Sequence, residues 1–178
     1  MLIEETRPSL SNKWISHFLN MAREHSELSK DPSTKVGAVI IRPNKTIASV
    51  GFNGFPMGCH DKPENYADRE KKYRRVVHAE MNAICFCNEV MDNYTLFTYP
   101  FAPCPRCAGP IIQKGIKTVY YPIITAANQA LRERWATDLT ESMDMFLEAG
   151  VTAYGVLDTS PDFAQHAFQE MKFFKNVY

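Results

Sequence analysis

The chain has 178 residues, which suits one domain that buries roughly 70% of its unfolded surface and needs no disulfides to fold. Twenty basic and twenty acidic residues cancel, which disfavours a nucleic-acid substrate, because binding a phosphate backbone usually requires excess positive charge. No apolar run approaches the ~20 residues that span a bilayer, so we expect no membrane contact. The five cysteines include a CxxC pair, and no charged-then-apolar leader begins the chain, so we expect a cytoplasmic protein.

The first third of the chain predicts a helix followed by a hairpin. Ser11 can cap the helix, and its apolar residues follow the three-and-four spacing of one buried face: Trp14, Ile15, Phe18, Leu19 and Ala22. Residues 36–41 and 46–52 are rich in strand-forming residues and flank a Pro-Asn turn, which predicts an antiparallel hairpin. Glycines and prolines then indicate a loop up to about residue 63 that is able to line a site.

Further elements follow in alternation along the rest of the chain. We predict a helix over 76–89, a strand over 94–99, a helix from Pro103 to Gly115, a strand over 118–121, a long helix over 128–149 that ends at Gly150, a strand over 151–156, and a last helix from Pro161 toward Phe174. Two cysteines in the first of these helices, Cys85 and Cys87, are expected to be buried small hydrophobes.

The order of these elements predicts the architecture. Strand–helix–strand units require parallel pairing, because a helical crossover cannot join neighbouring antiparallel strands. With the antiparallel hairpin, this pattern indicates a three-layer α/β domain, in which helices cover both faces of a mixed five-stranded sheet. We expect one domain over residues 1–178, with a core at about 14–155 and a helical tail at about 159–178.

Two short motifs carry the chemistry, and both open a predicted helix. They are His78-Ala79-Glu80 and Pro103-Cys104-Pro105-Arg106-Cys107. The positive end of a helix favours thiolate and so lowers the pKa of Cys104. One helical turn places the sulfurs of Cys104 and Cys107 on the same side, and His78 would add a nitrogen. Three protein ligands leave the fourth position of a tetrahedral Zn²⁺ for water, as in a catalytic site.

Each motif also has a simpler interpretation. A CxxC pair that opens a helix in an α/β chain is typical of thioredoxin-like redox proteins. A closed structural zinc, with Cys59 or His60 as fourth ligand, would instead make the chain a zinc-stabilised interaction module without enzymatic activity. Neither alternative gives Glu80 a role, whereas in the first turn of a helix Glu80 can reach a metal-activated water and act as a proton shuttle.

The HxE and PCxxC pair is the signature of zinc-dependent nucleobase deaminases. Three segments also resemble the deoxycytidylate deaminase family in order and spacing: DPSTKVGA at 31–38, GFNGFP at 51–56 and HAEMNAI at 78–84. This resemblance covers about residues 14–155. It implies the cytidine-deaminase-like fold, one catalytic Zn²⁺ per subunit, a homo-oligomer (hexamer or dimer), and hydrolysis of dCMP to dUMP and ammonia.

The resemblance also implies roles for individual residues. Glu80 takes a proton from the water and protonates N3 of cytosine, and the backbone around Ala79 contacts the pyrimidine edge. Asn53 holds the nucleotide near its sugar and base. The segment Ser33-Thr34-Lys35 resembles the family's segment near the nucleotide phosphate. Cytidine, cytosine, guanine and tRNA adenosine remain alternative substrates, because related enzymes share both motifs.

Two other segments are candidates for phosphate or effector contacts. Some family members are regulated by dCTP and dTTP through a GYNG segment, which here reads Gly51-Phe52-Asn53-Gly54 and so lacks the tyrosine hydroxyl. A basic cluster contains Arg69, Lys71, Lys72, Arg74 and Arg75, of which Arg69 and Lys72 are the candidates for an anionic ligand. The alternative interpretation of this cluster is a solvated helix face.

Overall fold

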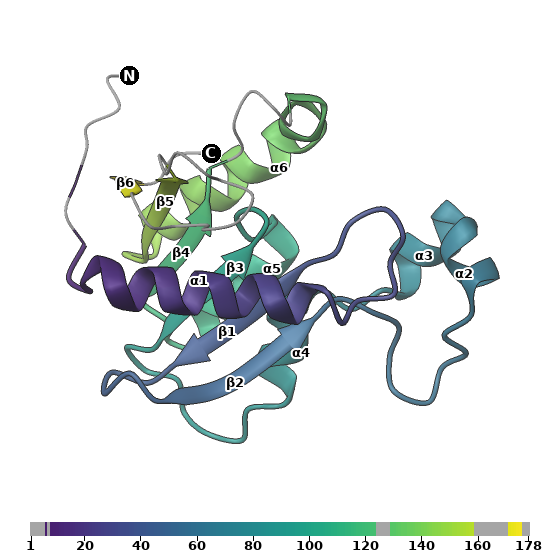
Figure 1. Cartoon of the computed structure of the whole chain (residues 1–178), viewed down its shortest axis with the longest axis horizontal. Coiled ribbons are helices and arrows are strands. Elements are labelled where there is room, and N and C mark those ends of the chain that lie inside the picture. Colours follow the sequence, from purple (N-terminus) through teal and green to yellow (C-terminus); the bar gives the residue numbers. More distant parts are fainter. Residues whose placement is uncertain (1–5, 7, 124–128, 159–170, 176–178) are drawn as a thin grey trace.

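The structure is a computed structural model that describes residues 6, 8–123, 129–158 and 171–175, with the backbone alone at 129–132. Within these residues, six strands form one mixed sheet in the order β2-β1-β3-β4-β5-β6 (Figure 1). The strands are β1 Gly37–Ile41, β2 Ile47–Phe52, β3 Thr95–Tyr99, β4 Thr118–Pro122, β5 Thr152–Asp158 and β6 Met171–Lys175. The β1–β2 hairpin is antiparallel and β3, β4 and β5 are parallel, which confirms the predicted mixed sheet.

One face of the sheet is covered by α1, Asn12–Ser26. Its buried residues follow the predicted stripe, except that Trp14 is only partly buried. They pack on the alternate strand residues that point to this side, among them Val39, Phe97 and Tyr120. Ser11 occupies the capping position, as expected, but its side chain makes no capping hydrogen bond.

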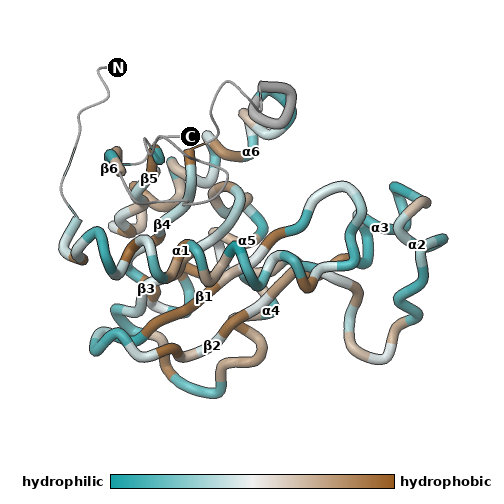
Figure 2. The backbone as a smooth tube through the Cα atoms, in the orientation of Figure 1, coloured by the Kyte–Doolittle hydropathy of each residue, from teal (hydrophilic) through white to brown (hydrophobic). Residues whose placement is uncertain are grey.

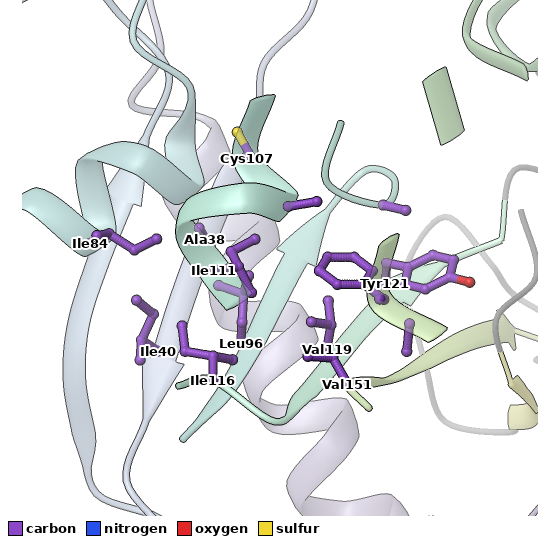
Figure 3. Close-up of a cluster of buried hydrophobic side chains, with 14 of the residues drawn as sticks. Ala38, Ile40, Ile84, Leu96, Cys107, Ile111, Ile116, Val119, Tyr121 and Val151 are labelled. Carbon is purple, nitrogen blue, oxygen red and sulfur yellow. The ribbon is translucent and has the colours of Figure 1, made fainter. Parts of the chain in front are cut away.

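The opposite face carries three helices, α4 Ala79–Cys85, α5 Pro105–Gln113 and α6 Gln129–Glu148. Their apolar residues pack with Ala38, Ile40, Leu96 and Val119 in a second core, and Cys107 lies at its margin (Figure 3). Because both faces are covered, β1 is buried at every residue, whereas the edge strand β2 is mostly partly buried or exposed. Burial on both faces explains why β1 reads as a mainly apolar run, which is largely hydrophobic in Figure 2.

The polar segment between the hairpin and α4 forms two short helices, α2 Pro63–Ala67 and α3 Arg69–Arg75. They project from one end of the sheet (Figure 1) and are mostly hydrophilic (Figure 2). Asp68 caps α3 by accepting a hydrogen bond from the backbone of Lys71 at 3.0 Å. None of the helices in the described part of the chain is long and apolar enough to cross a membrane.

The C-terminal segment differs from the sequence prediction. The predicted helix toward Phe174 is wrong at residues 171–175, which form β6 antiparallel to β5, with Phe173 opposite Val156. The strand buries Phe173 in the core beneath α1, and the sheet therefore has six strands rather than five. The remainder of that predicted helix, including Phe163 and Phe168, lies outside the described residues.

Helix boundaries also differ. The predicted helix over 76–89 is shorter, because Val77 pairs in an isolated bridge with Gly54 and the backbone turns helical only after His78. The expected burial is confirmed for Cys87 but is wrong for Cys85, which is exposed on the outer side of α4. The helix expected to start near Pro103 begins at Pro105, and it ends before Gly115, whose φ of +80° confirms the predicted left-handed stop.

The approach of α4 to β2 depends on Gly51. A Cβ atom on Gly51 would lie 2.3 Å from the carbonyl oxygen of Ala79 and 2.5 Å from the backbone nitrogen of Ala83. Gly51 therefore explains why the helix that starts at the HAE motif can lie directly against the strand, and it does so without invoking an effector.

Replacing Gly51 by alanine is expected to lower the free energy of unfolding by about 1–3 kcal/mol, because α4 must move away from the sheet. Urea denaturation measures the change. The control is Gly109→Ala in α5, where a Cβ meets nothing within 4 Å and alanine is the better helix former. Equal stability of Gly51→Ala and the wild type would contradict the packing argument.

Candidate metal centre and active site

The two sequence motifs meet at the N-termini of α4 and α5. His78 and Cys104 each occupy the capping position of their helix, with extended backbone at ψ 156° and 169°. Glu80 follows in the first turn of α4, as the sequence predicts. In α5, Pro105 takes the first helical position, where its fixed φ suits the helix and its missing N–H is not needed.

The three proposed metal ligands converge on one point. Nδ1 of His78 lies 3.4 Å from the sulfur of Cys104 and 3.4 Å from that of Cys107, and all three ligand atoms lie within 4.8 Å of one another. Zn–S bonds of about 2.3 Å and Zn–N bonds of about 2.0 Å at a tetrahedral angle separate the nitrogen and sulfur by about 3.5 Å. The residues therefore fit a zinc ion held through Nδ1 and two thiolates.

The protonation of this cluster favours a cation. A hydrogen-bonding interaction with the neighbouring Cys107 lowers the pKa of Cys104 to about 4, with a further contribution from His78. The same interaction, together with burial, raises the pKa of Cys107, so this thiol keeps its proton in the metal-free protein. The lowered pKa agrees with the sequence prediction, although the hydrogen bond rather than the helix terminus is the main cause. Binding of a divalent cation would release the remaining proton.

Glu80 lies beside the cluster and is only 3% exposed. Its Oε2 atom is 3.5 Å from the sulfur of Cys107. Burial is the largest cause that raises the pKa of this carboxyl above its usual value. A bound cation would act in the opposite direction, because it stabilises the carboxylate. The group can therefore change its protonation during a reaction, as a proton shuttle requires.

The cluster contains three ligand residues and no fourth. Among the residues that the structure describes, no other histidine, cysteine or acidic residue joins His78, Cys104 and Cys107. Cys59 and His60, the ligands considered for a closed structural site, are both exposed and outside the cluster. This arrangement leaves one tetrahedral position for water or substrate, which distinguishes a catalytic zinc site from a structural one.

A cavity opens in front of the cluster. It is lined by His78, Glu80, Cys104, Ser33, Thr34, Val36, Asn53, Asp31, Lys72, Tyr73, Val76, Phe101, Ala102, Arg134, Trp135 and Leu139. On one side, Phe101 and Trp135 stack with ring centroids 6.2 Å apart. The cavity thus combines a flat apolar wall with the metal cluster and Glu80, which suits a planar heterocycle.

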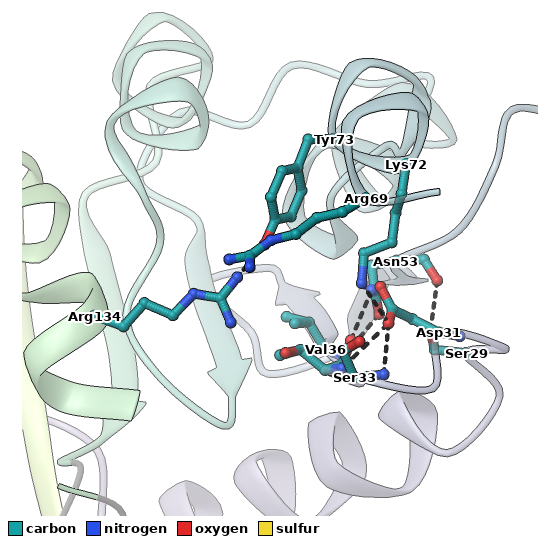
Figure 4. Close-up of polar contacts among 10 residues, drawn as sticks. Ser29, Asp31, Ser33, Val36, Asn53, Arg69, Lys72, Tyr73 and Arg134 are labelled. Carbon is teal, nitrogen blue, oxygen red and sulfur yellow. Dashed lines mark hydrogen bonds and ion pairs between the residues drawn. The ribbon is translucent and has the colours of Figure 1, made fainter. Parts of the chain in front are cut away.

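Asn53 holds one wall of the cavity in place (Figure 4). Its Nδ2 donates to the carbonyl of Thr34 at 3.0 Å, and its Oδ1 accepts from the backbone of Val36 at 2.8 Å. Ser29 completes the contact by donating to the carbonyl of Asn53 at 2.8 Å. The amide therefore orients the 34–36 segment, and a direct contact between Asn53 and a nucleotide remains a prediction.

The same wall contains a buried ion pair. Oδ1 of Asp31 accepts from the backbone of Ser33 at 2.8 Å and Thr34 at 3.2 Å, and from Nζ of Lys72 at 2.8 Å (Figure 4). Asp31 and Lys72 are 3% and 6% exposed. The interpretation of Lys72 as part of a solvated helix face is therefore wrong. No separate role for Asp31 follows from the sequence alone, because its partner lies 41 residues away.

The other candidate contacts lie at different distances from the cavity. Ser33 and Thr34 line it, whereas Lys35 is exposed, outside the lining, and paired with Glu27 at 2.8 Å. Phe52 is exposed at the sheet edge, and Gly54 pairs with Val77 at the entry to the HAE motif. Ala79 is fully buried at the start of α4.

A cluster of exposed side chains forms the opposite rim, and Arg69 is the only one of them that the sequence marks as a candidate. The hydroxyl of Tyr73 accepts from Nε of Arg69 at 3.1 Å and from Nη2 of Arg134 (Figure 4). Arg134 comes from α6, 61 residues from Tyr73. No local motif marks it, because an exposed arginine in a long helix is ordinary in sequence.

Comparison with known proteins identifies the family. The model of the cytidine and deoxycytidylate deaminase zinc-binding region matches residues 12–123, which include both motifs. The chain belongs to this deaminase family. Membership confirms the family expected from the sequence and assigns the cluster of His78, Cys104 and Cys107 to a region that binds zinc. It leaves the redox-pair interpretation without support.

The similar deaminases cover different shares of the chain. An uncharacterized deaminase encoded in the luxG 3′ region of Aliivibrio fischeri is 44% identical over 140 residues, which are 79% of this chain and 91% of that protein. Deoxycytidylate deaminase of Mus musculus is 38% identical over 116 residues, 61% of this chain and 64% of that protein. The chain thus spans just under two thirds of the mouse protein's length.

Solved structures agree with the deaminase assignment. The dCMP deaminase of cyanophage S-TIM5, in complex with dCMP and dUMP, superposes with a TM-score of 0.62 at 26% identity. The match covers 81% of this chain and 97% of the phage protein. It confirms the cytidine-deaminase-like α/β fold expected from the sequence, with the correction that the described sheet has six strands.

Proposed function

We propose that the protein hydrolyses dCMP to dUMP and ammonia. The observation that carries this proposal is the buried carboxyl of Glu80, 3.5 Å from a sulfur of a three-residue zinc cluster and facing a cavity with an aromatic wall. A structural zinc site has no use for an open ligand position or for a buried acid beside it. Hydrolytic deamination requires both.

The proposed reaction adds one water to C4 of cytosine and releases the 4-amino group. His78, Cys104 and Cys107 would hold a zinc ion, which would supply Lewis-acid activation of the water. Glu80 accepts the proton that the water loses, delivers it to N3, and then carries a proton to the departing amine. Atoms balance, because dCMP and water become dUMP and ammonia.

The chain's other residues position the ring. Phe101 and Trp135 provide a flat wall, and the backbone of Ala79, between the ligand His78 and the acid Glu80, is proposed to contact the pyrimidine edge. Burial of Glu80 keeps bulk water from competing for its proton. The 33–36 segment, held by hydrogen bonds to Asn53 and Asp31, closes the cavity on the side opposite the rim.

The choice of dCMP is supported by the mouse deoxycytidylate deaminase and by the phage dCMP deaminase in complex with dCMP and dUMP. We further propose a single deaminase domain, a homo-oligomer and a cytoplasmic location. Regulation by dCTP and dTTP also remains a proposal, to be tested by adding each nucleotide to the assay.

Ammonia release from the purified protein tests the activity. We expect kcat/KM to be higher for dCMP than for deoxycytidine, cytidine, cytosine, guanine and adenosine, because binding energy from the phosphate is realised only by a nucleotide. Assaying dCTP beside dCMP compares the triphosphate with the monophosphate. Release must scale with protein concentration and cease in zinc-depleted protein. Turnover of an unphosphorylated base alone would refute the nucleotide assignment.

A further inference from the structure

Two arginines on the rim of the cavity share one uncharged hydrogen-bond acceptor, the side chain of Tyr73. Tyr73 accepts hydrogen bonds from both Arg69 and Arg134, and the guanidinium of Arg69 also lies over the Tyr73 ring, 5.4 Å from its centroid. Among the described residues, no carboxylate lies within ion-pair distance of either guanidinium. Bringing two like charges together without an anion costs free energy, which a bound anion would recover.

The hydroxyl of Tyr73 can also donate a hydrogen bond to an anion. A phenol oxygen carries one O–H donor and accepts through its lone pairs. With both arginines donating to the oxygen, the hydrogen of Tyr73 remains to be donated to an acceptor. The Tyr73 hydroxyl and the two guanidinium groups thus present donors at one place (Figure 4).

The charge of the surrounding hollow is positive. Its lining contains Arg69, Arg134 and a third arginine, Arg106, which directly follows Pro105 in the first turn of α5. Asp138 is the sole carboxylate among the described residues that line it. The hollow shares His78, Cys104, Tyr73, Arg134 and Trp135 with the cavity that contains Glu80. An anion in the hollow can therefore belong to the same molecule as a ring at Glu80.

The opposite wall is poorly suited to the same anion. The backbone N–H groups of Ser33 and Thr34 already donate to the carboxylate of Asp31, whose negative charge would repel a phosphate. The cation of Lys72 is neutralised by the same carboxylate, and Lys35 lies outside the cavity. The 33–35 segment thus offers few free donors, whereas the rim offers several.

We propose that Arg69 and Arg134, held together by Tyr73, bind the 5′-phosphate of the nucleotide substrate and so set the preference for a nucleotide over a nucleoside. This inference rests on the proposed function. Arginine suits the role, because its planar guanidinium can form two parallel hydrogen bonds to phosphate. Tyr73 is a positioning residue in addition to a donor, and Arg106 adds positive charge to the hollow.

The test compares dCMP with deoxycytidine, which differ only in the phosphate. Arg134→Ala and Arg69→Ala are each expected to lower kcat/KM for dCMP by about 10- to 100-fold, as for loss of hydrogen bonds to a charged group. The loss for deoxycytidine should stay below about 3-fold, since the base and the metal cluster are untouched. Tyr73→Phe should lower kcat/KM for dCMP by a smaller factor.

A matched control is Arg75→Ala, which removes an exposed arginine from the same helix as Arg69 but from outside both hollows. It should keep the wild-type ratio of kcat/KM for dCMP to that for deoxycytidine. Titration calorimetry gives a second readout that needs no turnover: Arg134→Ala should weaken binding of dUMP, and Arg134→Lys should restore part of it. Zinc content and the circular dichroism spectrum establish that each variant is folded.

Three outcomes would overturn the inference. Equal losses on dCMP and deoxycytidine would make the arginines structural or part of an effector site. Unchanged kinetics in Arg69→Ala and Arg134→Ala would place the phosphate elsewhere, as would an equal loss in Arg75→Ala. A wild-type protein that releases ammonia from neither compound would instead refute the proposed function itself, and the two failures are therefore distinguishable.

Discussion

The variant Glu80→Gln should retain zinc and lose turnover by at least about 10³-fold, within the range expected for removal of a general acid–base. Glutamine has nearly the same shape as glutamate, so the cavity and the metal ligands should be preserved. It cannot accept the proton from water or protonate N3. Metal analysis and ammonia release from dCMP measure the two effects on the same sample.

A second measurement separates a catalytic role of Glu80 from a structural one. Its burial raises the carboxyl pKa, which shows that the ionised side chain is unfavourable in the metal-free fold. Metal-free Glu80→Gln is therefore expected to unfold at a temperature no lower than metal-free wild type. Glu24→Gln, at an exposed residue of α1, serves as the control and should change neither property. A Glu80→Gln protein with normal turnover would exclude the proposed mechanism.

Loss of the Cys107 thiolate should lower turnover about as much as Glu80→Gln does, but by weakening zinc binding. Cys107→Ala removes one of the three proposed protein ligands. Removing a residue that only hydrogen-bonds to a metal ligand lowers metal affinity by up to about 10²-fold, so we expect zinc affinity to fall by more than that. Turnover should fall in proportion to the zinc lost. Dialysis against a chelator followed by metal analysis measures retention.

Metal restoration provides the decisive comparison. Chelated wild-type protein should recover its activity when Zn²⁺ is returned, whereas Cys107→Ala should not at the same concentration. Cys85→Ser, an exposed thiol in α4, is the control for general effects of removing a cysteine. Stoichiometric zinc in chelated Cys107→Ala would show that this sulfur is not a ligand.

The parts of the fold that depend on local sequence patterns could be predicted from the sequence. The stripe on α1, the β1–β2 hairpin and the parallel order of β3, β4 and β5 follow from periodicity, turn residues and connection type. β6 could not be predicted, because Met171–Lys175 is a strand only by pairing with β5. Its aromatic residues are equally compatible with an amphipathic helix when that partner is unknown.

The residues of the candidate site also divide into those that local motifs predict and those that only folding brings together. His78, Glu80, Cys104 and Cys107 stand in two compact motifs whose spacing reveals their chemistry. The contact from Asp31 to Lys72 joins residues 41 apart, and that from Tyr73 to Arg134 joins residues 61 apart. Neither contact can be read from either of the segments that it joins. Only the folded chain shows that one pair is buried in the cavity wall and that the other stands at its entrance.

The separate origins of these groups have a consequence for engineering. The metal cluster and Glu80 stand on α4 and α5, which are anchored on the sheet, while Arg69 and Tyr73 belong to α3 and Arg134 to α6. On the proposed roles, reaction chemistry and substrate choice would be carried by different elements of the chain. Libraries restricted to Arg69, Tyr73, Arg134 and Trp135 could retarget the enzyme toward other aminated substrates, because they leave the metal cluster, Glu80 and the buried pair of Asp31 and Lys72 unchanged.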